Sequence, residues 1–165
     1  MIIVGCDSST KAIGLARITE TGDLIDTLLL EPQGKRALDR VTNLPDLMPR
    51  GTWWDGITHL IIEQQPIGRT TGGWECALIA GAIVHEAARH GAHILPLTPA
   101  GWRKQLGWPR MSSEEAKLGA RALLRTHMPV LALTGMPSEH EAEAYCIAYA
   151  GWLMLDPTRF YYAVT

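Results

Sequence analysis

Two acidic residues in this sequence stand at the ends of apolar, β-rich runs, where a carboxylate can do chemistry. Asp7 follows the run IIVGC and precedes the polar turn SSTK, and Glu63 closes the run ITHLII. An acid at such a place can cap a turn, meet a phosphate or hold a metal ion. Because Glu is a poor turn former, Glu63 favours a chemical role more strongly than Asp7 does.

A further acidic group lies near the C-terminus, in the segment PSEHEAEAYCIAYAGW. Ser138 followed three residues later by Glu141 matches a helical capping box, which gives Glu141 a structural job. His140 and Glu143 are three residues apart and share a helix face, and Glu139 lies four residues before Glu143. Acids also gather in a first helical turn simply because they oppose the helix dipole.

Carboxylates from two strand ends and one helix would together suit a hard divalent cation. Mg²⁺ takes oxygen ligands, usually a few carboxylates together with substrate phosphate, and Mn²⁺ accepts similar ligands. Two such ions about 4 Å apart activate a water and stabilise the leaving oxygen in phosphodiester cleavage. The acids therefore predict this chemistry, provided that the fold brings the three segments together.

The hydrophobic pattern predicts the elements that must position these residues. Five short β-rich runs predict strands: 2–6, 12–19, 24–30, 57–63 and 92–97. Gly22 and Asp23 predict a hairpin turn between the second and third runs. The run at 57–63 has no polar break after His59, which is typical of a central strand buried on both faces.

Helical spacing and capping residues predict five helices: near 35–43, over 74–90, a short one after Thr98 and Pro99, over 114–127, and over 139–155. Pro45 and Pro49 predict an irregular stretch before the fourth strand. The last helix is apolar nearly all round, so we expect it to lie deep in the domain, with its polar first turn near Asp7 and Glu63.

The element order predicts a mixed α/β sheet of five strands, the first three antiparallel and the later ones parallel, flanked by helices. With 165 residues, 47% of them hydrophobic, we expect one domain over 1–165. The net charge of −2 is unlike that of a strongly basic nucleic-acid binder. Three widely spaced cysteines, with no signal peptide and no run long enough to span a membrane, favour a cytoplasmic protein.

The motifs in this order resemble those of the RuvC-type Holliday junction resolvases, which are ribonuclease H-like nucleases. GCDSSTKAIGLA resembles the family's first-strand motif, LIIEQ its second and HEAEAYCIAYA its last, and the resemblance covers nearly the whole chain. Glu143 stands where the family usually has Asp, so its carboxylate reaches one methylene further from the backbone. The sequence looks like a divergent, phage-like member, from a bacterial cell or a phage-infected host.

The resemblance implies a ribonuclease H-like fold and a metal-dependent endonuclease that resolves four-way DNA junctions by paired symmetric nicks. It implies that Asp7, Glu63, His140 and Glu143 bind two Mg²⁺ or Mn²⁺ ions, with His140 either a ligand or the group that positions the attacking water. Paired nicks imply a homodimer with two-fold symmetry.

Basic residues beside the expected site are candidates for binding the DNA backbone. They comprise a residue of the loop after Glu63, a group around two tryptophans, and a pair four residues apart on the following helix: Arg69, Arg103, Lys104, Arg110, Lys117 and Arg121. Lys117 best matches the basic position of the family. A solvated helix face is the alternative interpretation for each of them.

Three other classes of protein remain open at this point. Actin-like kinases and ATPases share a related fold core and an acid before a small polar turn, but they need two such domains, and 165 residues hold only one. Small ribosomal-RNA-processing nucleases of the same superfamily fit the length. A non-catalytic nucleic-acid-binding module would use the basic residues alone.

Overall fold

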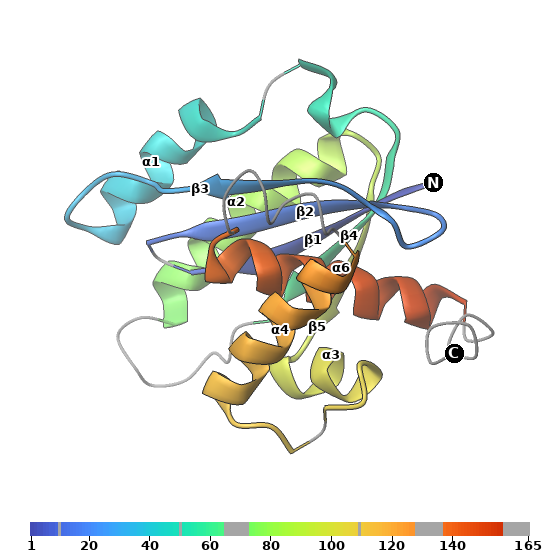
Figure 1. Ribbon diagram of the computed structural model, residues 1–165. Helices are drawn as coiled ribbons and strands as arrows, with labels where there is room; N and C mark the ends of the chain where they lie inside the picture. The colour runs from blue at the N-terminus through green and yellow to red at the C-terminus, as the bar shows by residue number, and fades with distance from the viewer. Residues whose placement is uncertain (10, 50, 65–72, 109, 128–136, 157–165) are drawn as a thin grey trace.

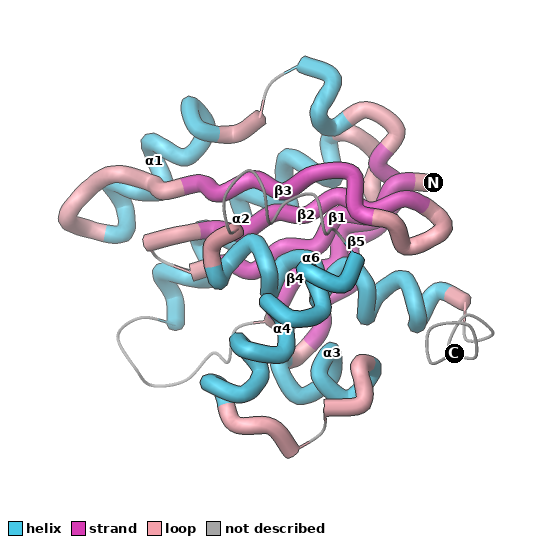
Figure 2. The backbone as a smooth tube through the Cα atoms, in the orientation of Figure 1, coloured by secondary structure: helices cyan, strands magenta, loops and turns pink. Residues whose placement is uncertain are grey.

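The computed structural model describes residues 1–9, 11–49, 51–64, 73–108, 110–127 and 137–156 and shows a five-stranded sheet with helices on both faces (Figures 1 and 2). The strands are β1 (Ile2–Ser8), β2 (Ile13–Thr19), β3 (Leu24–Leu30), β4 (Ile57–Glu63) and β5 (His93–Leu97). Each predicted strand is present. β1 ends at Ser8, two residues beyond its predicted end, and therefore includes Asp7.

The sheet order is β3-β2-β1-β4-β5. β1 pairs antiparallel with β2 and β2 with β3, whereas β4 runs parallel to both β1 and β5. The predicted mixed sheet, with its first three strands antiparallel, is therefore confirmed. β4 lies between two partners, as its unbroken apolar sequence predicted.

The helices are α1 (Ala37–Leu47), α2 (Gly73–Arg89), α3 (Pro99–Gln105), α4 (Ser113–His127) and α6 (Glu139–Leu155), with a 3₁₀ turn η1 at Gly51–Trp54. α1 differs most from its prediction, because it continues past residue 43 and includes Pro45. A proline inside a helix removes one intrahelical hydrogen bond and crowds the carbonyl four residues earlier, and Pro45 does so only in the last turn of α1.

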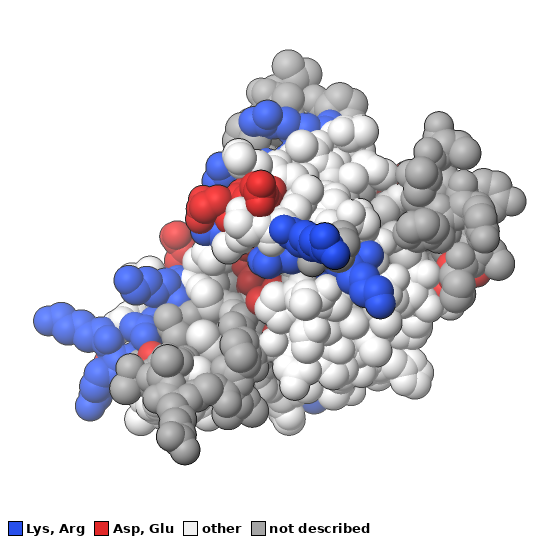
Figure 3. All heavy atoms as spheres, turned by 90° about the horizontal axis from the view of Figure 1, so that it is seen from below, with Lys and Arg blue, Asp and Glu red and all other residues white. Residues whose placement is uncertain are grey.

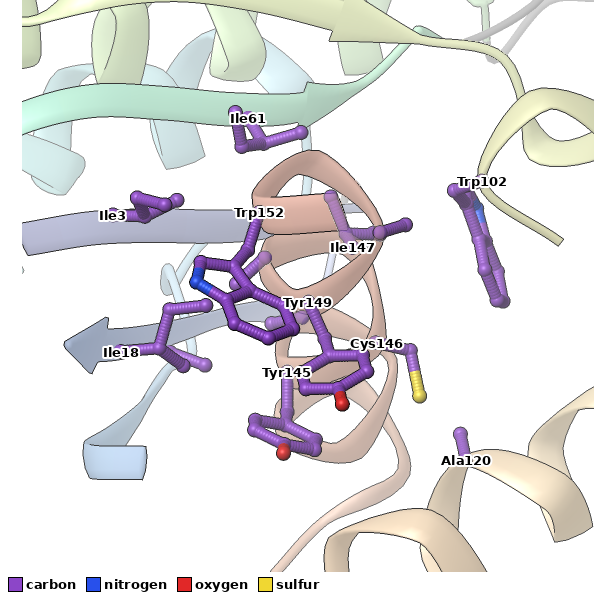
Figure 4. Close-up of a cluster of buried hydrophobic side chains, with 14 of the residues drawn as sticks. Ile3, Ile18, Ile61, Trp102, Ala120, Tyr145, Cys146, Ile147, Tyr149 and Trp152 are labelled. Carbon is purple, nitrogen blue, oxygen red and sulfur yellow. The ribbon is translucent and has the colours of Figure 1, made fainter. Parts of the chain in front are cut away.

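Hydrophobic cores form on both faces of the sheet. α3, α4 and α6 pack on one face, where Ile3, Ile18 and Ile61 project toward the aromatic and aliphatic side chains of α6 (Figure 4). α1, η1 and α2 cover the other face, with Trp54 among its largest buried side chains. None of the helices in the described ranges is long and apolar enough to cross a membrane.

Candidate functional site

Asp7 and Glu63 lie at the same edge and on the same face of the sheet. β1 and β4 are parallel neighbours, and their register pairs the residues that immediately precede the two acids. Side chains alternate between the faces of a strand, and Ile3 and Ile61 both belong to the core under α6. Asp7 and Glu63 stand an even number of residues after them, so both point to the side of the sheet that α6 covers.

Two glycines let the helix that carries His140 lie directly on this edge. A Cβ atom on Gly5 of β1 would overlap the backbone carbonyl oxygen of Ala144, and one on Gly14 of β2 would overlap that of His140. The backbone of α6 therefore approaches the sheet more closely than any larger residue at these positions would allow. This close approach brings the first turn of α6 to the end of β1.

The structure brings three of the four predicted ligands into one cluster. His140 Nδ1 lies 2.7 Å from Asp7 Oδ2, and Asp7 is only 7% exposed. One ligand atom each from Asp7, His140 and Glu143 fall within 4.8 Å of one another. In the described part of the chain, no other three His, Cys, Asp or Glu side chains gather as closely.

The charges of the cluster perturb its own titration. Burial, followed by the negative charges of Asp7, Glu63 and Glu139, raises the pKa of Glu143 to about 7. The hydrogen bond to Asp7 raises the pKa of His140 above its ordinary value. The two shifts differ in their leading cause, but the negative charges of Asp7 and Glu139 raise both pKa values, as expected where acids crowd around a place that favours a positive charge.

Glu63 lies near this cluster but is held by a different element. The charge of Glu63 contributes to the raised pKa of Glu143, so the two carboxylates interact. Glu63 Oε2 accepts a hydrogen bond of 2.6 Å from the indole Nε1 of Trp102, in α3. The fourth predicted ligand is thus at the same edge, outside the tight group formed by Asp7, His140 and Glu143.

Glu141 has the structural job that the capping box predicted. The Ser138 side chain accepts a hydrogen bond from the Glu141 backbone N–H, and Glu141 Oε2 accepts one of 2.8 Å from the Ser138 backbone N–H. Its other oxygen, Oε1, accepts a bond of 2.7 Å from the hydroxyl of Thr27 on β3. These contacts join the start of α6 to the sheet.

The donor set fits a hard divalent cation. Two carboxylates and an imidazole already converge, a third carboxylate interacts with them, and the group carries excess negative charge in a half-buried place. Mg²⁺ and Mn²⁺ prefer oxygen ligands with few nitrogen donors, whereas Zn²⁺ structural sites are dominated by Cys and His. Asp7, Glu63, His140 and Glu143 are therefore the side chains that could hold such ions.

The predicted DNA-binding residues that the structure describes differ in their exposure and in the charges around them. Arg69 lies outside the described residues. Arg103 is partly buried, with its guanidinium 5.1 Å from the centre of the Trp102 ring, whereas Lys104 and Arg110 are exposed. Figure 3 views the molecule from the side of α3 and α4 and shows Lys and Arg side chains interrupted by acidic ones.

Lys117 and Arg121, on α4, face the start of α6. Lys117 Nζ lies 2.8 Å from Glu139 Oε1 and 3.2 Å from Glu114 Oε1, and Arg121 Nη2 lies 3.9 Å from Glu139 Oε2. Glu139 is thus the acid that connects the basic face of α4 with the candidate site. Its negative charge partly compensates both cations.

Sequence reasoning did not assign a role to Trp102, Thr27, Gly5 or Gly14. Their contributions depend on contacts between residues far apart in the chain, such as the 39 residues that separate Glu63 from Trp102. One local signal did exist: Thr98 followed by Pro99 predicted where α3 begins, and thus that Trp102 lies in its first turns.

No protein-family model and no curated protein sequence matches the chain. Solved structures do match it over nearly its whole length. A RuvC structure from Thermus thermophilus is similar with a TM-score of 0.66 and 19% identity, over 96% of this chain and 98% of the other. T. thermophilus RuvC in complex with a Holliday junction substrate gives a TM-score of 0.64 and 18% identity, over 94% and 96% of the two chains.

The Holliday junction resolvase of fowlpox virus is similar with a TM-score of 0.55 and 12% identity, over 94% of this chain and 99% of the other. At identities this low, likeness in structure speaks for the fold. The sheet order, the antiparallel first three strands and the near-complete coverage agree with this likeness. The chain therefore has the ribonuclease H-like fold of RuvC.

Proposed function

We propose that the chain is a metal-dependent, structure-selective endonuclease that resolves four-way DNA junctions, and that it is a divergent, phage-like relative of the RuvC-type resolvases. One observation carries the proposal: Asp7, His140 and Glu143 converge within 4.8 Å at the carboxyl edge of the central strands. Open α/β sheets place their ligand sites at this edge.

The structural neighbours support the choice of substrate. They are RuvC, in one case with a Holliday junction substrate, and a viral Holliday junction resolvase. Fold alone does not determine function, so the proposal depends on the fold and the acidic cluster together. A junction has two-fold symmetry, and a homodimer would place one active site at each of the two strands that are cut.

The chain's own residues divide the work. Asp7, Glu63 and Glu143 would supply carboxylate oxygens to two Mg²⁺ or Mn²⁺ ions. When bound, such ions activate a water for attack on the phosphodiester and stabilise the leaving oxygen. His140, hydrogen-bonded to Asp7, would either complete the ligand set or hold the attacking water, and its raised pKa suits it to carry a proton.

Basic side chains would hold the DNA backbone next to this edge. We propose this role for the loop, α3 and α4 residues named above: Arg69, Arg103, Lys104, Arg110, Lys117 and Arg121. The three cysteines, Cys6, Cys76 and Cys146, are odd in number and far apart in the sequence, which suits a reducing compartment, and we propose the cytoplasm of a bacterial or phage-infected cell.

Cleavage of three labelled substrates tests the proposal. A synthetic four-way junction, a linear duplex of the same sequence and a structured RNA are incubated with the protein in Mg²⁺, Mn²⁺ or EDTA. We expect metal-dependent, paired symmetric nicks in the junction, with Glu143→Gln as the inactive control. Preferred cleavage of the RNA would instead favour a ribosomal-RNA-processing nuclease, and binding without any cleavage would favour a non-catalytic module.

A further inference from the structure

The indole of Trp102 donates a short hydrogen bond to one of the four predicted ligands. Its Nε1 lies 2.6 Å from Glu63 Oε2, whereas the bond between Asp7 and His140 measures 2.7 Å. A buried tryptophan N–H usually finds an acceptor, and a backbone carbonyl would serve that need. Here the acceptor is the carboxylate that the proposed function assigns to a metal ion.

The chain brings Trp102 to Glu63 through a short, well-defined path. β5 ends at Leu97, which pairs with Glu63 across the parallel strands, and the Gln64 backbone N–H donates to the Leu97 carbonyl. Thr98 then caps α3 by accepting a hydrogen bond from the Gly101 backbone N–H. α3 therefore begins directly beside Glu63. Trp102, which follows Gly101 in this helix, faces back toward the sheet and contacts Glu63.

Packing holds the indole in this position. Trp102 has 0% exposure, and it lies in the core between α3, α4 and α6, on the side of α6 from which Ile147 projects (Figure 4). Trp108 packs edge-on against it, with ring centroids 6.4 Å apart, and the Arg103 guanidinium covers one face of the ring. A donor held on several sides can fix the orientation of the flexible carboxylate that it contacts.

The chemistry of the donor matters as much as its position. An indole N–H can only donate and carries no charge, so it orients Glu63 while leaving the carboxylate its negative charge. A lysine or arginine at this place would orient the carboxylate but also neutralise it and compete with a cation. Partners behind a metal ligand orient it in this way, and Mg²⁺ is sensitive to such orientation because it demands near-octahedral geometry.

We propose that Trp102 is a positioning residue for the metal centre. Its indole N–H holds the Glu63 carboxylate in the orientation that binds the ions. This inference rests on the proposed function, since it takes Glu63 as a ligand. The alternative is that the hydrogen bond only satisfies a buried N–H. The two differ in one respect: only positioning connects Trp102 with the affinity for metal.

Metal binding to the protein without DNA provides the test. Free Mn²⁺ is measured by electron paramagnetic resonance for the wild type, Trp102→Phe and Trp54→Phe. Both variants lose the same ring volume and one indole hydrogen bond from a buried place, but Trp54 lies on the opposite face of the sheet and donates to the Pro49 carbonyl. We expect Trp102→Phe to weaken Mn²⁺ binding about 10- to 100-fold, the usual cost of losing a partner behind a ligand. Trp54→Phe should stay within about twofold of the wild type, since it keeps the hydrogen bond from Trp102 to Glu63.

Equal Mn²⁺ affinity in Trp102→Phe and the wild type would overturn the inference while leaving the proposed function standing. Failure of the wild type itself to bind Mn²⁺ would overturn the proposed function as well. A Glu63→Gln background adds a further check. In that background Trp102→Phe should weaken Mn²⁺ binding little further, because Trp102 acts through the carboxylate that is already missing. A loss of Mn²⁺ affinity as large as in the wild-type background would mean general structural damage and would overturn the inference.

If Trp102→Phe does not fold, the wild type still permits a test. The chain has six tryptophans, whose indole N–H groups are resolved by NMR in ¹⁵N-labelled protein. The resonance that shifts in Glu63→Gln identifies Trp102, and we expect Mg²⁺ to shift the same resonance in the wild type. An indole signal that moves in Glu63→Gln but not on addition of Mg²⁺ would overturn the inference.

Discussion

The raised pKa of Glu143 leads to a prediction about stability that needs no DNA. Without a bound cation, Glu143 is half-buried among carboxylates, and its pKa is raised from 4.5 to about 7. The folded protein therefore holds this proton more tightly than the unfolded chain does. It follows that the contribution of Glu143 to stability falls as the pH rises from about 4.5 to about 7 and stays low above that.

The size of the effect follows from the shift. Moving a carboxyl pKa from 4.5 to about 7 corresponds to at most about 3 kcal/mol, and partial exposure to solvent reduces this to about 1–2 kcal/mol. Glu143→Gln removes the charge while keeping the shape of the side chain. In a chain of this size we expect its melting temperature in EDTA to exceed that of the wild type by about 3–6 °C at pH 8.

The measurement is thermal unfolding in EDTA from pH 5 to pH 8, repeated with saturating Mg²⁺. The difference between Glu143→Gln and the wild type should grow with pH in EDTA. It should shrink or reverse in Mg²⁺, because the ion stabilises the folded wild type. The same variant should lose junction cleavage by more than about 100-fold, since even the outer partners of metal ligands cost 10- to 100-fold.

Glu141→Gln is the matched control, on the same helix and with the same chemical change. Glu141 accepts hydrogen bonds from the backbone of Ser138 and from Thr27. Its variant should lose about 1 kcal/mol by a weakened cap at every pH and keep most of its cleavage. A difference between Glu143→Gln and the wild type that does not change between pH 5 and pH 8 would refute the electrostatic reasoning.

Three further predictions follow from single contacts. Asp7→Asn should abolish cleavage but preserve junction binding in a gel-shift assay, and cleavage by this variant would remove Asp7 from the site. Lys117→Ala should weaken junction binding and reduce the slope of its salt dependence by about one phosphate contact. Glu139→Gln, which removes the negative charge 2.8 Å from Lys117, should tighten binding at low salt. Gly14→Ala should cost about 1–3 kcal/mol or more in denaturant unfolding and reduce cleavage, because α6 must move away; Gly81→Ala, in open space on α2, should be neutral or stabilising.

Much of the fold could be predicted because its elements carry local signals. The run before Glu63 has the unbroken apolar sequence of a central strand, and Thr98 with Pro99 predicted the start of α3. The capping box at Ser138 and Glu141 set both the start and the rotation of α6. That rotation matters for the site, since it separates the capping role of Glu141 from the face shared by His140 and Glu143.

The remaining features depend on contacts that no local pattern contains. The sequence around Gly14 predicts a strand whether or not a helix packs against it. The need for glycine at this position is visible only in the structure, where the His140 carbonyl lies over Gly14. The hydrogen bond from Trp102 to Glu63 likewise joins different elements. Lys117 was predicted as a DNA-binding residue, and no local pattern could show its ion pair with Glu139 on α6, which ties it to the candidate site.

The burial of α6 offsets the cost of gathering the acids at one edge of the sheet. Crowding Asp7, Glu63, Glu139 and Glu143 at one edge of the sheet costs stability in the absence of a cation, as the raised pKa of Glu143 shows. The same helix that brings His140 and Glu143 to this edge is buried along nearly all of its length from residue 142 to residue 153. Burial of those side chains stabilises the helix against the sheet by far more than the repulsion among the acids costs. The helix can therefore hold the carboxylates together before any cation arrives, which is the preorganisation that a metal site requires.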